Sequence, residues 1–473
     1  MTPNDRNGLR SSESNRSLNN LNIPANRVSS GDLAITLSLC ENASKHPDQM
    51  KNQREKPGPR DLIDLLILQP TPFCNIDCDY CYLPDRKNPK RMSGAVIDKT
   101  IQIAVGSGLV KDRLSIVWHA GEPLAVPLAF YEDAFERINA RADGVTIMHS
   151  IQTNGTIIDQ RWCDLFGKHG VSVGVSIDGP AFVHDRHRKD RAGLGTHARV
   201  MRGIEMLKAN SIPFHTIAVV TEDSLPHADA IFEFFLNLGA FQVGFNIEEL
   251  EGIHSSSTLS ASSNDKVEAF FHRIYALQQQ SAVYLPIREF DRAYHSIANV
   301  SGSEPAQGNQ QNVPFGILSI DWDGNISTFS PELLGAVSEK YANFAFGNVE
   351  TDDLSQLLDN PIFVGLATEI HAGVQNCAKE CEYFAFCGGG APANKFYENG
   401  DFSSTETMYC RHTIQLPVEI VLSDLEQQLG LGNSRRRTVN TESATAMNLM
   451  EGLAVTRRPR ENSLGKLVQI TES

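Results

Sequence analysis

The chain has 473 residues, which is enough for two or three domains or for one large domain with extensions. Its 42 basic and 57 acidic residues give a formal net charge of −15, which argues against nucleic-acid binding because that function needs a basic surface. The polar stretch Met1–Ser30 shows no secretory signal, and no apolar run approaches the length of a membrane span, so no membrane partner is expected.

The first half of the chain predicts an α/β fold. Residues 1–56, which include Cys40, are rich in Ser, Asn, Arg and Pro and are predicted to be disordered, with an inert Cys40. From 57 to 251, apolar runs typical of strands alternate with amphipathic stretches typical of helices. The predicted strands are Leu62–Leu68, Leu114–Trp118, Val145–Ile151, Val171–Ile177, Phe214–Val220 and Phe241–Phe245, and the helices between them include Pro127–Ala140, Asp159–His169, Thr196–Ala209 and Leu225–Leu238. This alternation predicts a parallel sheet.

The second half divides into three segments. Residues 252–311 form a connecting segment with a predicted helix at Val267–Gln278 and a loop at Gly308–Asn312. A strand and turn at Gly316–Ser327 open a second region that spans residues 312–429. Residues 430–473 form a polar, arginine-containing tail that is predicted to be disordered.

Three cysteines follow the first predicted strand in the spacing C-x3-C-x2-C: Cys74, Cys78 and Cys81. Cysteine thiolates are the usual ligands of iron–sulfur clusters. Three thiolates occupy three irons of a [4Fe–4S] cube and leave the fourth iron open to a small molecule. The alternatives are a zinc knuckle that lacks one ligand, or three incidental buried thiols; a structural zinc site needs four ligands, and no nearby Cys or His supplies the fourth.

Four further cysteines lie late in the chain: Cys377, Cys381, Cys387 and Cys410. Four thiolates saturate a cube, which makes an electron-transfer or structural centre, and the glycines after Cys387 let the backbone approach a bulky inorganic core. A four-cysteine zinc site has the same ligands, and the first cysteine set favours iron. Cys163 lies inside a predicted amphipathic helix and is expected to be a core or surface thiol.

The first cysteine set, with the aromatic Tyr80 before its last member, resembles the radical S-adenosylmethionine (SAM) superfamily. The resemblance implies a partial (β/α)6 barrel with its chemistry at the carboxyl ends of the strands. It also implies that Cys74, Cys78 and Cys81 hold a [4Fe–4S] cluster whose open iron is chelated by the amino and carboxylate groups of SAM. Free thiols and a low-potential cluster need a reducing compartment, so a cytoplasmic location is expected.

The resemblance also assigns residues that would contact SAM. In the turn Trp118–Leu124, Gly121 and Glu122 would meet the SAM amino group, although Ala120 stands where relatives have a first glycine. The remaining contacts would come from the ends of later strands: Thr153, Asn154 and Ser176 to ribose or carboxylate, Arg188 to the carboxylate, and Val219 to adenine, unless Val219 is plain core. His184 and His187 are interpreted as solvated loop residues.

The second cysteine set resembles the SPASM extension of peptide-modifying radical SAM enzymes, which often carries two auxiliary clusters. Here Phe329 and Ala391 stand where relatives place ligand cysteines, and the chain has no cysteine between Cys163 and Cys377. These losses belong to one cluster, so the resemblance implies a single auxiliary [4Fe–4S] cluster, held by the four late cysteines, and two clusters in total.

The chain resembles the cyclophane-forming peptide maturases of the GrrM/OscB type in five passages: QPTPFCNIDCDYCYLPDR, WHAGEPL, GILSIDWDGNISTFSPELLG, FAFGNV and CGGGAPANKFYENGDFSSTETMYCR. This implies a ribosomal precursor peptide as substrate and a low-potential electron donor of the flavodoxin or ferredoxin type. A 5′-deoxyadenosyl radical from SAM would take a hydrogen from a side-chain carbon, which would then attack an aromatic ring of the same peptide. The ring would release an electron to the auxiliary cluster and a proton to an unassigned base.

Glu332 and Asp323 are candidates for that base, but both are interpreted as solvated turn carboxylates. Two other functions remain open on the sequence. The first is another radical SAM modification of a protein, either sulfatase-type formylglycine formation or thioether formation. The second, from a different class, is a non-catalytic zinc-binding interaction protein.

Overall fold

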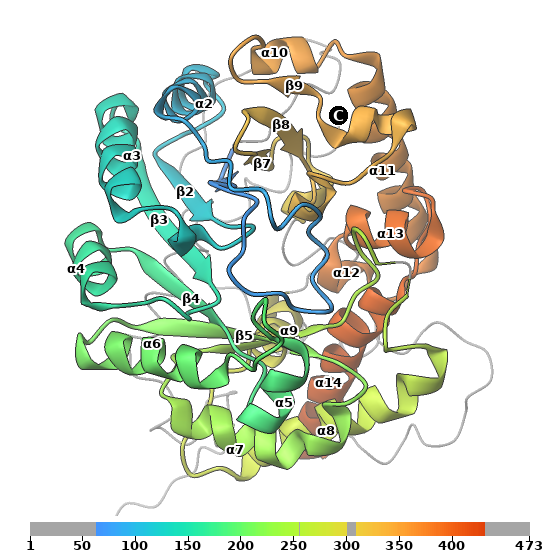
Figure 1. Ribbon diagram of the computed structural model, residues 1–473. Helices are drawn as coiled ribbons and strands as arrows, with labels where there is room; N and C mark the ends of the chain where they lie inside the picture. The colour runs from blue at the N-terminus through green and yellow to red at the C-terminus, as the bar shows by residue number, and fades with distance from the viewer. Residues whose placement is uncertain (1–62, 255, 300–308, 431–473) are drawn as a thin grey trace, which may run out of the picture. The chain divides into compact units, whose positions relative to one another are not determined.

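The computed structural model describes residues 63–254, 256–299 and 309–430 (Figure 1). A nine-stranded sheet has the strand order β6-β5-β4-β3-β2-β1-β7-β8-β9. The strands are β1 Leu65–Leu68, β2 Arg113–Trp118, β3 Thr146–Thr153, β4 Ser172–Ser176, β5 Phe214–Val220, β6 Val243–Ile247, β7 Ile317–Ile320, β8 Asn325–Thr328 and β9 Gly347–Asn348. Strands β1 to β6 are parallel and lie side by side in chain order, as the alternating pattern predicts.

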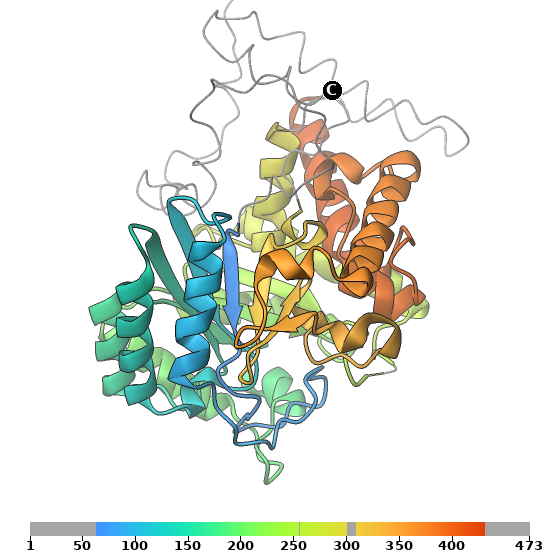
Figure 2. The same ribbon diagram turned by 90° about the horizontal axis from the view of Figure 1, so that it is seen from above.

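Helices connect the parallel strands and continue into the second half of the chain. They are α2 Gly94–Gly106, α3 Leu128–Arg141, α4 Gln160–His169, α5 Ala181–His187, α6 His197–Ala209, α7 Ala228–Leu238, α8 Asn264–Gln280, α9 Arg288–Asn299, α10 Leu354–Leu357, α11 Pro361–Glu380, α12 Phe384–Cys387, α13 Pro392–Asn399 and α14 Leu416–Gln428. Short 3-10 turns are η3 Pro123–Ala125, η4 Leu225–His227, η5 Ala261–Ser263, η6 Gln310–Asn312, η7 Pro331–Leu333 and η8 Glu339–Phe344, and η9 Cys410–Gln415 is a π-helical turn. Figure 2 shows α2 and α3, in blue and teal, against the outer side of the parallel strands.

Local sequence explains where several of these helices begin and end. The Ser93 side chain accepts a hydrogen bond from Val96 N at the start of α2, and Asp159 accepts one from Trp162 N at the start of α4. Gly170 ends α4 in the left-handed conformation, with φ of 61°. In β5 buried and half-buried residues alternate, which is the period of a strand with one face under helices. The predicted α/β fold with a parallel sheet is confirmed.

The strand that opens the second region joins the same sheet. Strand β7 pairs in parallel with β1, with Leu65 opposite Ile317, and β8 and β9 extend the sheet with antiparallel pairing. The predicted boundary near residue 312 therefore separates two stretches of chain that share one sheet. The predicted loop at Gly308–Asn312 contains the short turn η6, and Gly308 itself lies outside the described residues.

Several predicted features cannot be compared with the structure. The N-terminal segment 1–56 with Cys40, and the tail 430–473 apart from Gly430, lie outside the described residues. Described residues up to Asp424 belong to one compact unit, and residues 425–430 at the end of α14 belong to a second. Within the described ranges, no helix has the length and apolar character needed to cross a membrane.

Candidate active site and second cysteine centre

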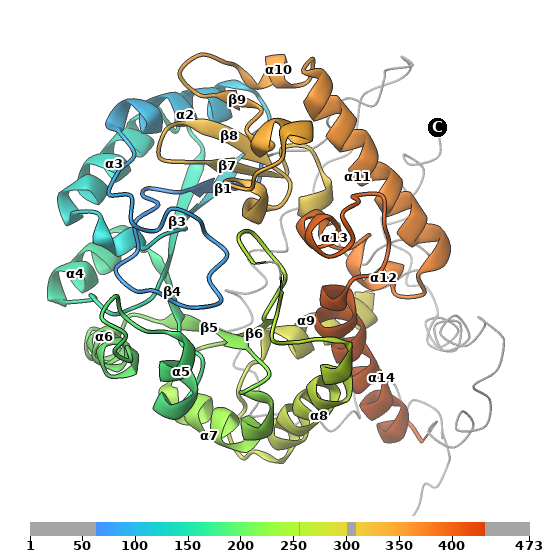
Figure 3. The ribbon, with the colours of Figure 1, turned by 45° about the vertical axis from the view of Figure 1, so that its right-hand side comes forward.

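The first cysteine set lies on the loop between β1 and α2, which Figure 3 shows in blue next to the carboxyl ends of the neighbouring strands. Cys74 and Cys78 are buried and pack with Ile76 as one cluster, against which the half-buried Cys81 and Tyr80 lie. Burial raises the pKa of Cys74 and of Cys78 to about 12. Thiols in such surroundings stay protonated unless a cationic centre draws their charge, and iron would do so.

Hydrogen bonds to the backbone of this loop hold it in place. Asp77 N donates to Lys189 O over 2.6 Å, and Arg191 Nη2 donates to Cys74 O over 2.7 Å. Arg86 Nη1 donates to Cys78 O over 3.0 Å. Because these bonds come from the segment after β4 and from the loop itself, the three thiols are pre-positioned by the barrel.

The turn after β2 meets the cysteine loop at Gly121. This glycine has φ of +59°, and a Cβ built on it would lie 2.4 Å from Thr71 O and 2.6 Å from Phe73 O. Only glycine allows the two backbones to approach so closely. Ala120, which stands where relatives have the first glycine, also has a positive φ of 69°.

Glu122 occupies an interior position, with 1% of its surface exposed. Its Oε1 accepts hydrogen bonds from Leu124 N at 2.9 Å and Thr153 Oγ1 at 2.6 Å, and its Oε2 accepts one from Asn154 N at 2.8 Å. Burial raises the pKa of Glu122 to about 7. Both of its oxygens are engaged by the protein, so in this structure Glu122 shapes the turn and orders the end of β3.

The polar residues at the ends of β3 and β4 connect to the cysteine loop. Asn154 Nδ2 donates to Asn75 Oδ1 at 2.8 Å and lies 3.8 Å from Cys74 Sγ. At the next strand, Gln152 Nε2 donates to Ser176 Oγ at 2.9 Å. Thus Thr153, Asn154 and Ser176 stand at the ends of adjacent strands, as the sequence predicts, because parallel strands bring their carboxyl ends to one edge.

Asp178 organises the end of β4, a role that sequence reasoning missed. Its carboxylate accepts two hydrogen bonds from the buried Arg188, at 2.9 and 3.0 Å, one from Tyr80 OH at 2.5 Å and one from Val219 N at 2.9 Å. Burial alone would raise the pKa of Asp178, but the Arg188 guanidinium holds it below its ordinary value. The guanidinium predicted to meet the SAM carboxylate therefore already has one carboxylate partner. Val219 is half-buried on the face of β5 opposite Ala218 and Val220.

The interpretation of His184 and His187 as solvated loop residues is wrong. Both lie on α5, and His184 has no exposed surface, with its ring nitrogens at 3.4 Å from Asp178 N and 2.9 Å from Thr196 Oγ1. His187 Nδ1 lies 2.9 Å from Asp79 Oδ1 of the cysteine loop, and this hydrogen bond raises the pKa of His187. The two histidines thus link α5 to the end of β4, to Thr196 and to the cysteine loop.

The second cysteine set comes from four separate places in the fold. Cys377 lies in the last turn of α11, Cys381 caps that helix, Cys387 ends α12 and Cys410 begins η9. Burial raises the pKa of Cys381, Cys387 and Cys410, and the neighbouring thiols of the set contribute to each increase. Each of these three thiols therefore has at least one other thiol of the set close enough to affect its acidity.

Other residues near this region follow the predicted pattern. Gly388, Gly389 and Gly390 all have positive φ, and a Cβ at Gly390 would lie 3.3 Å from Cys410 Sγ. Phe329 is fully buried and stacks on Phe363 with ring centroids 6.0 Å apart, so an aromatic core fills the position of a missing ligand. Ala391 is also buried, and Cys163 is a buried thiol of α4. All cysteines in the described ranges are free of disulfides.

Comparison with known proteins identifies the family. The model of the radical SAM superfamily matches residues 68–235, which contain the first cysteine set. The uncharacterized protein sll1766 of Synechocystis sp. is 44% identical over 381 residues, which cover 79% of this chain and 94% of that protein. This chain belongs to the radical SAM superfamily.

Two further relatives are sulfatase-maturating enzymes. The serine-type anaerobic enzyme of Klebsiella aerogenes is 36% identical over 40% of this radical SAM chain and 47% of its own length. The cysteine-type anaerobic enzyme of Clostridium perfringens is 26% identical over 69% of this chain and 88% of its own length.

Solved structures share the fold. Native anSMEcpe with bound AdoMet and Cp18Cys peptide has a TM-score of 0.62 and 21% identity, covering 78% of this chain and 98% of that one. Streptococcus suis SuiB bound to precursor peptide SuiA has a TM-score of 0.54 and 14% identity, covering 80% of this chain and 88% of that one. At these identities the likeness concerns the fold, and it extends beyond the barrel into the second cysteine region.

SAM and a [4Fe–4S] cluster are the cofactors of the superfamily, and the residues present fit them. The first set offers three gathered thiols on one loop beside a glycine that admits no side chain. The second set offers four buried or half-buried thiols beside a run of glycines, which fits an auxiliary cluster. In the described ranges no three or more His, Cys, Asp or Glu side chains are arranged to bind a single metal ion, whereas each thiolate of a cube binds a different iron.

Three glutamates form an acidic group beside the cysteine loop of this radical SAM enzyme. Glu249 and Glu251, which follow β6, are linked by a hydrogen bond, and Glu332 in η7 adds its charge to theirs. Burial raises the pKa of Glu249 to about 7, that of Glu251 well above its ordinary value, and that of Glu332 as well. The interpretation of Glu332 as a solvated turn carboxylate is therefore wrong, whereas Asp323 is exposed as expected.

The backbone next to this acidic group packs on the cysteine loop. A Cβ at Gly252 would lie 2.1 Å from Tyr82 O, and Ile253 N donates to the same oxygen over 3.3 Å. The His254 ring Nε2 lies 3.0 Å from Cys81 O. The segment that carries Glu249 and Glu251 is thereby held against the residues that follow the last cysteine of the first set.

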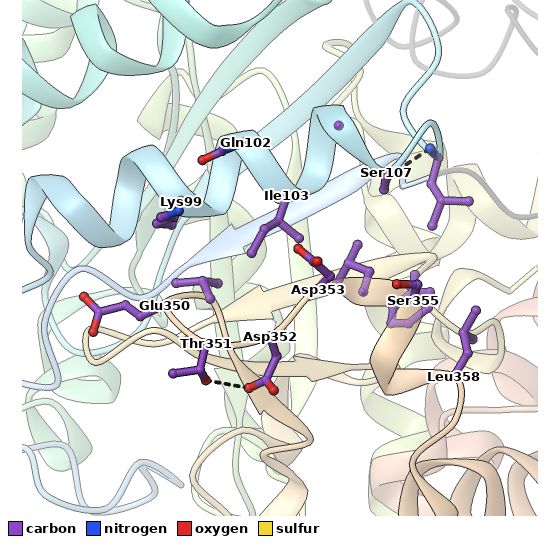
Figure 4. Close-up of a pocket in the computed structure, with 15 residues that line it drawn as sticks. Lys99, Gln102, Ile103, Ser107, Glu350, Thr351, Asp352, Asp353, Ser355 and Leu358 are labelled. Carbon is purple, nitrogen blue, oxygen red and sulfur yellow. Dashed lines mark hydrogen bonds between the residues drawn. The ribbon is translucent and has the colours of Figure 1, made fainter.

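A separate cavity of about 700 Å³ lies on the outside of the barrel (Figure 4). It is lined by residues of α2, such as Lys99 and Ile103, and of the segment 349–358, such as Asp352 and Asp353. None of the predicted site residues lines it, so this cavity is not the predicted SAM site.

Proposed function

We propose that this radical SAM enzyme modifies a ribosomal precursor peptide by joining an aromatic ring to a side-chain carbon, as the GrrM/OscB-type cyclophane maturases do. The observation that carries the proposal is the combination of one three-cysteine centre on the barrel loop with one four-cysteine centre in the extension. A crosslink needs both a radical initiator and an acceptor for the electron that rearomatisation releases. Likeness in fold to solved complexes with peptides supports a peptide substrate.

When bound, the first cluster supplies the electron that splits SAM into methionine and a 5′-deoxyadenosyl radical. The protein residues orient the reactants. Cys74, Cys78 and Cys81 would hold the cluster, and Gly121 lets the turn after β2 pack closely on the cysteine loop. Thr153, Asn154, Ser176, Arg188 and Val219 would contact SAM from the ends of β3, β4 and β5 and from the segment after α5. Tyr80 supports this arrangement through its hydrogen bond to Asp178.

Glu251 is the group best placed to receive the proton that leaves the aromatic ring. It lies beyond the carboxyl end of β6, it is buried, and it shares a hydrogen bond with Glu249. A carboxylate whose pKa is raised by burial and by three acidic neighbours, here Glu249, Glu332 and Glu398, is a stronger base than an exposed one. We expect Glu251→Gln to leave 5′-deoxyadenosine formation intact and to lower crosslinking by about 10²-fold, the usual effect of a general base.

Co-expression with a candidate precursor peptide tests the function. The crosslinked peptide should lose two hydrogens per event, and fragmentation should place the new bond between an aromatic residue and a carbon a few residues away. The control is the same peptide with the Cys74, Cys78 and Cys81 to Ala variant, which should return it unmodified. An aldehyde on the peptide, or loss of sulfur, would contradict the crosslink.

Sulfatase-type formylglycine formation is the second candidate, because the relatives of this chain include serine-type and cysteine-type anaerobic sulfatase-maturating enzymes. The buried Phe329 and Ala391 at two expected ligand positions distinguish this chain from the two-auxiliary-cluster pattern. The same peptide experiment with a sulfatase-derived peptide decides between the two, since formylglycine produces an aldehyde. Metal analysis should find about eight irons and no stoichiometric zinc per chain.

A further inference from the structure

A buried lysine lies at the second cysteine centre. Lys395, on α13, has only 2% of its surface exposed, and its Nζ donates to Cys377 Sγ over 3.3 Å. Its charge also acts on Cys410, where it lowers the pKa against the larger effect of burial. No carboxylate among the described residues lies within the 4.0 Å that defines an ion pair with it. The ammonium therefore lies against Cys377 and near Cys410 without an ion-pair partner in the described ranges. Its charge nevertheless contributes, after hydrogen bonds from Ser403, to the lowered pKa of the exposed Asp401.

Two glycines make room for this side chain. A Cβ at Gly373 of α11 would lie 3.0 Å from Lys395 Nζ and 2.2 Å from Phe402 O. A Cβ at Gly390 would lie 3.6 Å from Lys395 Cε and 3.3 Å from Cys410 Sγ. Any side chain at Gly373 would push against the ammonium or the backbone. The fold is thus shaped to hold a cation at this place.

An isolated buried ammonium is costly, at several kcal/mol even after relaxation. Four neutral thiols would not compensate for this cost, but four thiolates around an iron–sulfur core carry a net negative charge. One-electron reduction makes that charge more negative. A fixed cation against one ligand sulfur therefore stabilises the reduced form more than the oxidised form, and net charge and hydrogen bonds to the sulfurs are known determinants of cluster potential.

We propose that Lys395 is a positioning residue that raises the reduction potential of the auxiliary cluster held by Cys377, Cys381, Cys387 and Cys410. The inference rests on the proposed function. After the peptide carbon has bonded to the aromatic ring, the ring radical loses one proton to a base and one electron to the oxidised cluster. The reduced cluster returns that electron to a one-electron carrier protein of the flavodoxin or ferredoxin class. Lys395 favours the electron transfer into the cluster.

The first cysteine set shows the opposite arrangement. There the neutral Asn154 amide lies 3.8 Å from Cys74 Sγ. The buried Arg188 guanidinium lowers the pKa of Cys78 against the larger effect of burial, but its charge is paired with Asp178. A cluster that must give its electron to SAM needs a low potential, which a neighbouring unbalanced cation would raise. The placement of the buried lysine at only one of the two centres matches the direction in which each centre would pass electrons.

The test measures the potential directly. A full-length chain with Cys74, Cys78 and Cys81 changed to Ala is reconstituted anaerobically, so that only the auxiliary cluster contributes to the signal. The electron paramagnetic resonance signal of the reduced cluster is then recorded as a function of the applied potential. Adding Lys395→Met should make one-electron reduction about tenfold less favourable, which corresponds to about 59 mV. Lys395→Arg should keep the potential within threefold of that of the lysine chain.

Lys379→Met is the matched control, because Lys379 is an exposed lysine on the same helix as Cys377 and only two residues from it. Removing its solvated charge should leave the potential unchanged, since water and salt screen it. If the Lys395→Met chain loses iron, the Lys395→Gln chain replaces it in the titration. If both chains lose iron while the Lys395→Arg chain retains it, the result also supports a requirement for positive charge at residue 395. Equal potentials in the Lys, Met and Gln chains at full iron content would overturn the inference.

This design separates the inference from the function on which it rests. A triple Ala chain that binds no iron would refute the auxiliary cluster itself. A chain with full iron content and a potential insensitive to residue 395 would refute only the role of Lys395. In the otherwise unchanged holoenzyme, Lys395→Met should keep 5′-deoxyadenosine formation and lower the yield of crosslinked peptide per SAM cleaved.

Discussion

The two cysteine centres are built in different ways. Cys74, Cys78 and Cys81 occupy one short loop after β1, and the barrel around that loop supplies the polar contacts that hold it. Cys377, Cys381, Cys387 and Cys410 come from α11, its cap, α12 and η9, and they are gathered by helix packing. The first centre has three thiols and the buried Asp178–Arg188 ion pair nearby. The second has four thiols and a buried lysine that forms no ion pair within 4.0 Å among the described residues.

Under the proposed function, this difference would let one chain hold two clusters with opposite tasks. A loop with three ligands leaves a corner for SAM and can be tuned by the strand ends around it. A four-ligand centre inside a helical extension is coordinatively full, so its surroundings can change only its potential and its accessibility. Four predictions follow the comparison from its strongest consequence to its weakest.

Changing Cys74, Cys78 and Cys81 together to Ala should reduce SAM cleavage to the level of a reaction without enzyme, because no thiolate remains to hold the electron-donating cluster. The measurement is 5′-deoxyadenosine by chromatography under reducing, anaerobic conditions. Iron should fall by about four atoms per chain, the content of one cube. Continued formation of 5′-deoxyadenosine would break the assignment of the first centre.

Cys387→Ala should separate the two centres. Because this residue belongs only to the second set, we expect 5′-deoxyadenosine to form at a rate within a few-fold of the parent chain, while crosslinked peptide falls below detection. Cys163→Ala is the matched control, since Cys163 is a buried thiol that belongs to neither set, and its change should leave both products in place. Equal loss of both products in Cys387→Ala would mean that the centres do not work separately.

Asp178→Asn should destabilise the fold around the first centre by about 3–5 kcal/mol, because it leaves the buried Arg188 charge without its partner. The free energy of unfolding from urea titration checks this. Asp223→Asn is the control: it removes an ion pair with Arg186 whose side chains are 46% and 53% exposed, and it should cost about 0–1 kcal/mol. Similar losses in both variants would show that the Asp178–Arg188 pair is not a buried support.

Three glycines with positive φ allow the cost of a Gly→Ala change to be compared at the two centres and at an open turn. Gly400 has φ of +70° and open space around it, so Gly400→Ala should cost about 1 kcal/mol from conformation alone. Gly390→Ala should cost slightly more, because its Cβ would press on Cys410 Sγ. Gly121→Ala should cost the most, more than about 3 kcal/mol, because its Cβ would meet two backbone oxygens that belong to the cysteine loop. Midpoints of urea unfolding give the order, and a Gly121→Ala chain as stable as Gly400→Ala would contradict the close approach.

Much of the fold was readable from the pattern of apolar residues. The predicted strand at Phe214–Val220 matches β5, and the predicted helices at Asp159–His169 and Thr196–Ala209 match α4 and α6 to within one residue. Periodicity sufficed here because each element buries one face against the next. It also predicted a strand at the start of Gly316–Ser327, where β7 Ile317–Ile320 lies. It did not predict that β7 pairs with β1, because this pairing joins residues about 250 positions apart and no local pattern encodes it.

The sequence by itself determined the first centre, since three ligands within eight residues of one loop must lie close together in any fold. It also identified the four late cysteines, and the small and polar residues at the strand ends. Only the tertiary structure decided which polar side chains are buried and which groups they contact. It paired Asp178 with Arg188 and buried His184. It also brought Glu332 near Glu249 and Glu251 and placed Lys395 against Cys377. The physical reason is that the charge and acidity of a side chain depend on desolvation and on neighbours distant in the chain, and only packing of the elements fixes both.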